Sequence, residues 1–246
     1  MKLTSLGIIP ARIGSSEIKR KNIRDINGKP LIYHTISSAI NSKLSRVIVS
    51  TDSPEIADIA KSYGADVPFI RPSFLSTNNS KAIDVISHCL DWLNRKEKWK
   101  PDIIGYMQPT SPMRTEKHIN TAISLMDETH DSVLSVTKVK EHPFYMFKKN
   151  SNEKLEEYIK MNNKPERRQD FTELYNSNPL VMFSWHSYLN RIKQNRGIIV
   201  NLKNFKPMLI SEFEAVDINT ELDFLIAENI MQNSHNLLNQ KSISLG

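Results

Sequence analysis

The sequence predicts an α/β fold in which helices cover both faces of a mainly parallel sheet. Strand-like and helix-like segments alternate from Lys2 to about Val139. Capping residues and prolines stand where several of the helical segments begin. Alternation of this kind is typical of βαβ units, whose crossover helices place parallel strands side by side. We therefore expect a three-layer α/β domain.

The expected strands are short and apolar. Residues 6–9 (LGII) carry no polar side chain, as in a strand buried on both faces, and Pro10 lacks the backbone donor needed to continue it. Residues 46–50 (RVIVS) are β-branched at their centre. The full set of expected strands is 5–10, 46–50, 67–70, 102–108 and 132–139.

The expected helices begin and end at recognisable signals. Apolar residues recur at helical spacing after Pro30, Ser53 precedes Pro54 as a cap followed by proline at the first helical position, and Gly64 ends that helix. Thr115 caps a later helix. We expect helices at residues 31–41, 54–63, 82–93 and 116–127, with a last helix running to about 239.

The alternation breaks between about Lys140 and Leu202. Residues 141–147 (EHPFYMF) are aromatic and apolar, residues 150–168 are polar and basic, and residues 180–184 resemble another strand. We expect 140–202 to leave the sheet as an inserted segment of a single domain spanning 1–246. Exposed aromatic side chains often form an interface between copies of a chain, and a flap over the chain's own site is the alternative.

Composition excludes several classes of protein. The formal charge of +6 is modest, its basic residues are dispersed, and no basic arm or zinc-finger spacing is present, so we do not expect a nucleic-acid partner. No apolar run approaches the ~20 residues that span a membrane, and we expect a cytoplasmic protein without a signal peptide. The single cysteine, Cys89, excludes an internal disulfide and is expected in the core.

The stretch after the first strand is suited to a polyphosphate. Gly14 and Ser15 allow close backbone approach to a ligand, and Arg12 and Lys21 supply positive charge at the carboxyl end of the strand. The stretch lacks both GxxxxGK[ST] and GxGxxG, which argues against an ATPase or a dinucleotide-dependent dehydrogenase. A solvated basic surface turn is the alternative interpretation.

A second polar turn, residues 108–114 (QPTSPMR), follows the strand expected at 102–108. Its amide, hydroxyl and guanidinium groups are suited to the hydroxyls and carboxylate of a sugar, and its two prolines would hold them rigidly. The alternative is that Thr110, Ser111 and Thr115 are turn and capping residues.

Asp217 and Asn219 form a third candidate site. Two residues apart at an expected strand end, their side chains would share one face. Mg²⁺ often takes one or two carboxylates together with substrate phosphates, so we expect Mg²⁺ here, with Mn²⁺ as the alternative ion. Thr220 and Asp223 instead resemble a capping box.

Taken in order, these segments resemble the cytidylyltransferases that activate nine-carbon acidic sugars, the acylneuraminate cytidylyltransferase family with its legionaminic and pseudaminic acid relatives. The resemblance covers almost the whole chain. It is carried by IIPAR.GS....KN, NGKPLIYHTI, VIVSTDS, RP..L, QPTSPMRT, RRQ and DINTELDFLIAEN. It implies a Rossmann-like nucleotidyltransferase with a small dimerisation excursion, acting as a homodimer on CTP and a 2-keto sugar acid.

The resemblance also implies roles for individual residues. Nucleotide binding falls to Ala11, Arg12, Ser15, Lys21, Asn22 and Arg71, and sugar binding to Gln108, Thr110, Ser111, Arg168 and Gln169. Arg168 and Gln169 match a pair that, in the family, can reach the neighbouring subunit's site. Arg12, Lys21 and Asp217 are the expected catalytic residues, with Asp217 and Asn219 as metal ligands. No general base is evident.

The chain departs from the family pattern at four positions. Ser16 replaces a usual Lys, Glu17 a usual Gly, Asn219 a second Asp, and Pro179 a usual Gly. These changes leave open a different acidic sugar, weaker metal binding or impaired activity. The alternative functions are a synthetase for CMP-Kdo, whose sugar is a related eight-carbon acid, and a non-catalytic nucleotide-sugar binding homologue.

Overall fold

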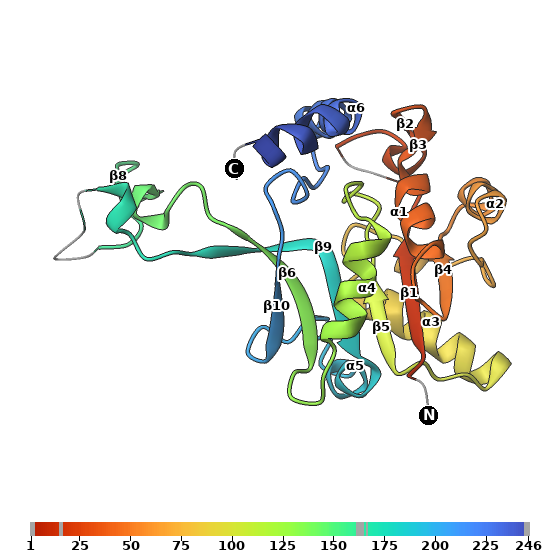
Figure 1. Ribbon diagram of the computed structural model, residues 1–246. Helices are drawn as coiled ribbons and strands as arrows, with labels where there is room; N and C mark the ends of the chain where they lie inside the picture. Colours follow the sequence, from red (N-terminus) through yellow and green to blue (C-terminus); the bar gives the residue numbers. More distant parts are fainter. Residues whose placement is uncertain (1–2, 15–16, 161–164, 166, 244–246) are drawn as a thin grey trace.

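A computed structural model describes residues 3–14, 17–160, 165 and 167–243 of the chain. Its main sheet has six strands in the order β10-β6-β9-β5-β1-β4 (Figure 1). These strands are β1 (Ser5–Pro10), β4 (Arg46–Ser50), β5 (Ile103–Tyr106), β6 (Ser132–Lys138), β9 (Tyr175–Trp185) and β10 (Phe205–Leu209). Two small antiparallel pairs join β2 (Asp25–Ile26) to β3 (Lys29–Pro30), and β7 (Phe147–Lys149) to β8 (Leu155–Glu157).

The sheet is mainly parallel, as the sequence predicts. β1 pairs in parallel with both β4 and β5, with Ile8 opposite Ile48 on one side and Tyr106 on the other. β6 pairs in parallel with β10. β9 runs antiparallel to both of its neighbours, β5 and β6. The carboxyl ends of β1, β4 and β5 therefore meet at one edge of the sheet.

The described part of the chain contains six α-helices, of which five lie between strands and α6 follows the last strand. They are α1 (Leu31–Ile40), α2 (Pro54–Ser62), α3 (Ala82–Glu97), α4 (Glu116–Leu125), α5 (His186–Ile192) and α6 (Glu221–Ile243). Short 3₁₀ turns lie at Lys21–Ile23, Ser73–Leu75, Pro143–Tyr145 and Arg168–Asp170. The expected caps are confirmed: Ser53 accepts a hydrogen bond from the N–H of Ile56, and Thr115 forms a capping box with His118.

Helices pack on both faces of the sheet and create two cores. Apolar residues of α1, α2 and α4 gather with the sheet in one cluster, and those of α3 and α5 gather with it in the other. Cys89 is fully buried in the second cluster. Gly105 of β5 is needed for this packing, because a Cβ there would lie 2.5 Å from the ring of Phe183. The three-layer α/β prediction is confirmed.

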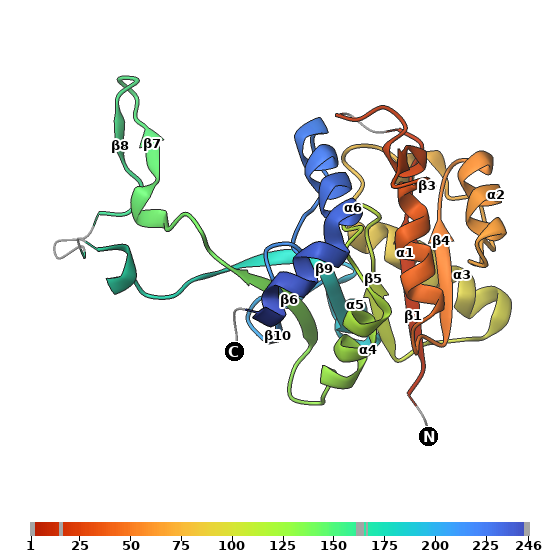
Figure 2. The same ribbon diagram turned by 45° about the horizontal axis from the view of Figure 1, so that its top comes forward.

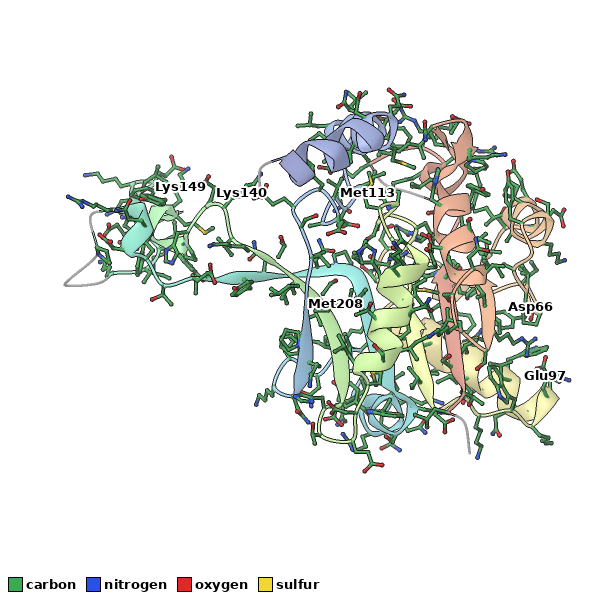
Figure 3. All side chains as sticks on the ribbon, in the orientation of Figure 1. Asp66, Glu97, Met113, Lys140, Lys149 and Met208 are labelled. Carbon is green, nitrogen blue, oxygen red and sulfur yellow. The ribbon has the colours of Figure 1, made fainter. Side chains whose placement is uncertain are left out.

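A smaller third core ties the loop after β1 to the start of α6. Ile18, Ile218 and Phe224 are buried together there, and Met113 packs against them. Figure 3 labels Met113 between α6 and the body of the molecule. Side chains far apart in the sequence therefore fix the loop after β1 beside residues 217–219. In the described part of the chain no helix is long and apolar enough to cross a membrane.

The prediction of a strand at residues 67–70 is wrong. Asp66 makes one isolated bridge to Ile48 beyond the sheet edge, and the backbone then continues without strand structure. Pro68 has no N–H to continue the pairing, and Ile70 is exposed. β10, an edge strand that contains Pro207, is a further strand that the sequence does not predict.

Residues 180–184 do not leave the sheet, contrary to the prediction. They belong to β9, which fills the centre of the sheet between β5 and β6. Residues 139–174 project from the body of the molecule and carry β7 and β8 (Figure 2). We call this segment the arm. Figure 3 labels Lys140 and Lys149 on this arm, well away from Asp66 and Glu97.

Candidate active site

A pocket of about 370 Å³ lies beyond the carboxyl ends of β1 and β5. The structure gathers there seven of the residues that the sequence analysis assigns to substrates or metal. They are Arg12, Lys21, Asn22, Arg71, Gln108, Thr110 and Asn219. The pocket therefore joins the loop after β1, the segment that holds Arg71, the turn after β5 and the loop before α6.

The loop after β1 is fixed at its base by hydrogen bonds. The N–H of Ala11 donates to the carbonyl of Ser50 over 2.9 Å, and the N–H of Ile13 donates to a carboxylate oxygen of Asp52 over 3.0 Å. Asn22 donates from Nδ2 to the carbonyl of Arg12 over 2.9 Å, which closes the loop on itself. Ala11 is fully buried, so its position beside the pocket is structural. Ser15 lies outside the described residues.

Lys21 links this loop to the segment before α6. Its Nζ donates to the carbonyl of Ile218 over 2.7 Å. Burial is the largest effect on Lys21 and lowers its pKa, while the negative charge of Asp217 opposes that shift. Lys21 consequently loses its charge at a lower pH than an exposed lysine. Glu17, which also lines the pocket, adds a negative charge that the family loop usually lacks.

Arg71 is nearly fully buried, with 4% of its surface exposed. Its backbone N–H donates to the carbonyl of Thr51 over 2.7 Å, and its Nε donates to the hydroxyl of Ser76 over 3.0 Å. Burial lowers its pKa, against the opposing effect of Tyr106 and Asp52. Arg71 thus presents a fixed positive charge to the α3 side of the pocket.

The turn after β5 divides its residues between the pocket and the interior. Gln108 and Thr110 line the pocket, and the carbonyl of Thr110 accepts a hydrogen bond from the N–H of Ile218 over 2.8 Å. Ser111 is fully buried and does not line the pocket. Its Oγ instead donates a hydrogen bond to Oδ1 of Asp217 over 3.4 Å and so helps to hold that carboxylate in place.

Arg114 does not face a sugar, in contrast to the functional reading of the QPTSPMR turn. Its side chain is 2% exposed, and its guanidinium donates to the carbonyl of Leu180 over 2.6 Å, to Oγ1 of Thr35 over 2.9 Å and to the carbonyl of Gln108 over 3.1 Å. Burial lowers its pKa to about 9, and Asp217 opposes that shift. Arg114 is a positioning residue that joins the turn to α1 and β9.

The metal-ligand candidates lie together but not at a strand end. β10 ends at Leu209, and Asp217 and Asn219 stand in the loop that precedes α6. Asn219 Nδ2 donates to Oδ2 of Asp217 over 2.8 Å, so the two side chains meet as expected. Asp223 accepts hydrogen bonds from Thr220, which confirms the capping box.

The donor set fits a cation that is shared with substrate phosphates. Asp217 supplies one carboxylate, and the described residues contain no group of three or more His, Cys, Asp or Glu side chains suited to a metal. Mg²⁺ keeps several waters and commonly binds through one or two carboxylates and substrate phosphates rather than through a protein cage. Asp217 would hold such an ion only when a nucleotide supplies the remaining ligands.

Gln169 lies outside this pocket, and the backbone of Arg168 lies beside it in the sequence. Both belong to the arm, where Gln169 lines a separate hollow of about 460 Å³ with His142 and Phe171. The structure therefore does not bring the pair to the site of its own chain, and their proposed reach into a neighbouring subunit stays a prediction.

Several pocket residues were missed by sequence reasoning. Leu75 ends the 3₁₀ turn Ser73–Leu75. Thr77, Asn78 and Ser80 lie in the loop between that turn and α3, and Val85 comes from the first turn of α3. Tyr106, the last residue of β5, also lines the pocket. Its position at the end of a strand beside a polar turn was the signal that would have found it.

A cationic loop, a buried arginine and a rigid polar turn around one pocket, at the carboxyl edge of a mainly parallel sheet, define a nucleotide-binding α/β protein. The family model described as cytidylyltransferase matches residues 6–243. The chain belongs to the cytidylyltransferase family.

Relatives with assigned names agree with this family. The chain is 35% identical to CMP-N,N'-diacetyllegionaminic acid synthase of Legionella pneumophila, over 97% of this chain and 98% of that protein. It is 30% identical to the N-acylneuraminate cytidylyltransferase of Escherichia coli, over 98% of this chain but 58% of that protein. It is 32% identical to the pseudaminic acid cytidylyltransferase of Campylobacter jejuni, over 70% of this chain and 75% of that protein.

A solved structure shares the fold. CMP:2-keto-3-deoxy-manno-octonic acid synthetase, determined in complex with CTP, aligns with a TM-score of 0.68 over 94% of this chain and 99% of that one. The sequence identity is 16%, so this likeness concerns the fold alone.

We expect Arg114→Met to lower the free energy of unfolding by about 3 kcal/mol or more, because each buried acceptor left without a donor costs roughly 1–3 kcal/mol. Denaturant unfolding monitored by circular dichroism measures this change. Arg191→Met is the control, since Arg191 forms an exposed ion pair with Asp131 whose loss costs at most about 1 kcal/mol. Equal stability of Arg114→Met and the wild type would contradict this prediction, because it would mean that relief of the buried charge fully offsets the lost hydrogen bonds.

Proposed function

We propose that the chain transfers CMP from CTP to the anomeric hydroxyl of a nine-carbon 2-keto sugar acid and releases pyrophosphate. The observation that carries this proposal is the pocket, which joins the cationic loop of Arg12 and Lys21 to the sugar-facing candidates Gln108 and Thr110. The relatives named as synthases of CMP-legionaminic acid and as cytidylyltransferases of sialic and pseudaminic acids support the same reaction.

The residues of the loop after β1 supply charge and position in the proposed reaction. The sugar hydroxyl has to approach the α-phosphorus opposite the departing pyrophosphate, on which negative charge accumulates. Arg12 and Lys21 line the pocket together with Gly14, so this side of the pocket combines positive charge with a residue that has no side chain to block a phosphate. Lys21 is held in place by its hydrogen bond to Ile218, so its charge needs no rearrangement during the reaction.

The acceptor is placed by the turn after β5. Gln108 and Thr110 project from a backbone that is fixed by Arg114 and by the hydrogen bond between Thr110 and Ile218. Such preorganised groups are suited to hold the hydroxyls and carboxylate of a sugar acid beside the triphosphate. Mg²⁺, held by Asp217 together with the phosphates, would neutralise charge on the departing pyrophosphate.

The test is pyrophosphate release from CTP and Mg²⁺ with sialic, legionaminic, pseudaminic and Kdo acids supplied separately. We expect release only when CTP, metal and one of the nine-carbon acids are present together. Lys21→Ala should reduce turnover by roughly 10²–10³-fold with the fold intact, because it removes a fixed charge from the transition state. Lys43→Ala, which alters an exposed lysine outside the pocket, is the matched control.

Two results would contradict this proposal in different ways. Release with Kdo alone would favour the eight-carbon acid as substrate. CTP binding by calorimetry without release on any of the four acids would favour a non-catalytic nucleotide-sugar binding homologue.

We also propose that Asn219 is a weak ligand of the catalytic Mg²⁺ (or Mn²⁺). Asn219→Asp should then lower the Mg²⁺ concentration that gives half-maximal rate, because a second carboxylate joins Asp217. The control is Asn78→Asp, which adds the same charge to the same pocket without contacting Asp217. Titration of the rate with Mg²⁺ measures both variants, and an identical shift in both would remove Asn219 from the metal site.

The arm supports the further proposal that the chain acts as a homodimer. None of the arm side chains that the structure describes is fully buried, and Phe147, Leu155 and Tyr158 are 58%, 71% and 61% exposed. A lone two-stranded hairpin is marginally stable in water, so the β7–β8 pair needs a surface to pack against. A second copy of the chain provides it, with Arg168 and Gln169 directed to that copy's site.

Phe147→Asp combined with Tyr158→Asp should convert the dimer to a monomer, because burying unpaired carboxylates at an apolar interface is unfavourable. Light scattering after size-exclusion chromatography measures the mass. Leu202→Asp replaces an exposed apolar residue outside the arm and should leave the dimer intact. A monomeric wild type at micromolar concentration would refute the assembly.

A further inference from the structure

Tyr106 is a buried polar residue to which neither the catalytic loop nor the sugar-facing turn gives a role. It is the last residue of β5 and lies opposite Ile8 of β1, at the carboxyl edge of the sheet. Only 6% of its surface is exposed, and it lines the pocket. Tyr106 therefore forms part of the wall of the site at the end of β5.

The hydroxyl of Tyr106 makes no hydrogen bond to any residue that the structure describes, and it is not among the buried polar atoms left without a partner, so it opens onto the pocket. Tyr188 is the other tyrosine buried in the same apolar cluster, and its hydroxyl donates a hydrogen bond to the carbonyl of Ile198 over 2.8 Å. A hydroxyl that opens onto a pocket bonds to water in the free protein, and a ligand atom can take the place of that water. The hydroxyl of Tyr106 is therefore available to a ligand in the pocket.

The surroundings of Tyr106 identify which part of the ligand it meets. Leu75 and Val85 line the pocket with it, and both are apolar. The cationic residues Arg12 and Lys21 line the pocket from the loop after β1. The base is the aromatic part of CTP and the triphosphate is its charged part, so the apolar wall around Tyr106 suits the cytosine ring.

The charge of Arg71 favours one orientation of the Tyr106 hydroxyl in its hydrogen bonds. Its charge lowers the pKa of Tyr106, although burial has the larger effect and raises that pKa to about 12, so the phenol keeps its proton. A neighbouring cation favours the orientation in which the hydroxyl oxygen faces the guanidinium and the hydrogen faces the pocket. In the described chain, Arg71 uses Nε on Ser76, and its terminal amino groups have no hydrogen-bond partner. The hydrogen-bonding groups that Arg71 and Tyr106 leave for a ligand are therefore donors.

We infer that Tyr106 is a specificity-determining residue that donates a hydrogen bond from its hydroxyl to N3 of the cytosine ring. N3 of cytosine accepts a hydrogen bond, whereas N3 of uracil carries a hydrogen and would face the donor unfavourably. The terminal amino groups of Arg71 supply donors for the adjacent carbonyl O2, which both bases share. The inference rests on the proposed use of CTP, and it assigns the choice of base to the end of β5.

The experiment is calorimetric titration of the full chain with CTP, dCTP and UTP, each with Mg²⁺, for wild type, Tyr106→Phe and Tyr188→Phe. Tyr106→Phe should raise the Kd for CTP and for dCTP by the same factor, about 5- to 100-fold, the effect of one buried hydrogen bond. The Kd for UTP should rise much less. Tyr188→Phe alters a buried tyrosine outside the pocket and should leave all three affinities unchanged.

Thermal unfolding of the same proteins separates binding from folding. Tyr106→Phe removes a hydroxyl that has no partner in the described chain, so its midpoint should match the wild type, whereas Tyr188→Phe should lower it. An unchanged Kd for CTP in Tyr106→Phe overturns the inference. So does an equal loss for UTP, or a loss for CTP that vanishes with dCTP, which would place the hydroxyl on the ribose. Wild-type binding of CTP tests the proposed function separately.

Discussion

The buried guanidinium of Arg114 is the interaction on which the site depends. It joins the carbonyls of Gln108 and Leu180 and the hydroxyl of Thr35, so one side chain holds the turn after β5 against β9 and α1 at once. The guanidinium has five donors and also serves the carbonyl of Pro179, which makes four acceptors, one more than the three donors of a lysine could serve. Because Arg114 fixes this turn from inside, Thr110 and its neighbours can face the pocket without being held by the pocket itself.

Much of the fold could be predicted because its signals are local. The apolar run and proline that bound β1, and the caps at Ser53 and Thr115, act within a few residues and appear in the structure as the sequence indicates. The errors arise where tertiary context decides. Residues 67–70 have strand-like composition but lie beyond an edge strand with Pro68 among them, while β9 enters the sheet from a segment whose neighbours leave it.

The same distinction applies to the pocket. Residues of the cationic loop and the polar turn stand out in the sequence because their chemistry is concentrated in short stretches, and the structure gathers most of them. Arg114 resembles its neighbours in that turn, and only burial shows that it points inward. The position of Tyr106 before the polar turn marks it as a candidate, but only the structure shows that it lines the pocket and that its hydroxyl has no partner in the described chain. Burial and partner satisfaction are properties of the folded chain and cannot be read from spacing.

The place of β9 in the sheet has a consequence for how the chain is made. Strands β5 and β6 leave the ribosome well before β9, yet β9 is the strand that separates them. Until residue 185 has been synthesised, β5 can pair only with β1, and β6 has neither of its neighbours, because β10 also follows β9 in the chain. Both strands then have edges open to pairing with other chains. The arm is translated during that interval, so its length sets how long the nascent protein carries those open edges.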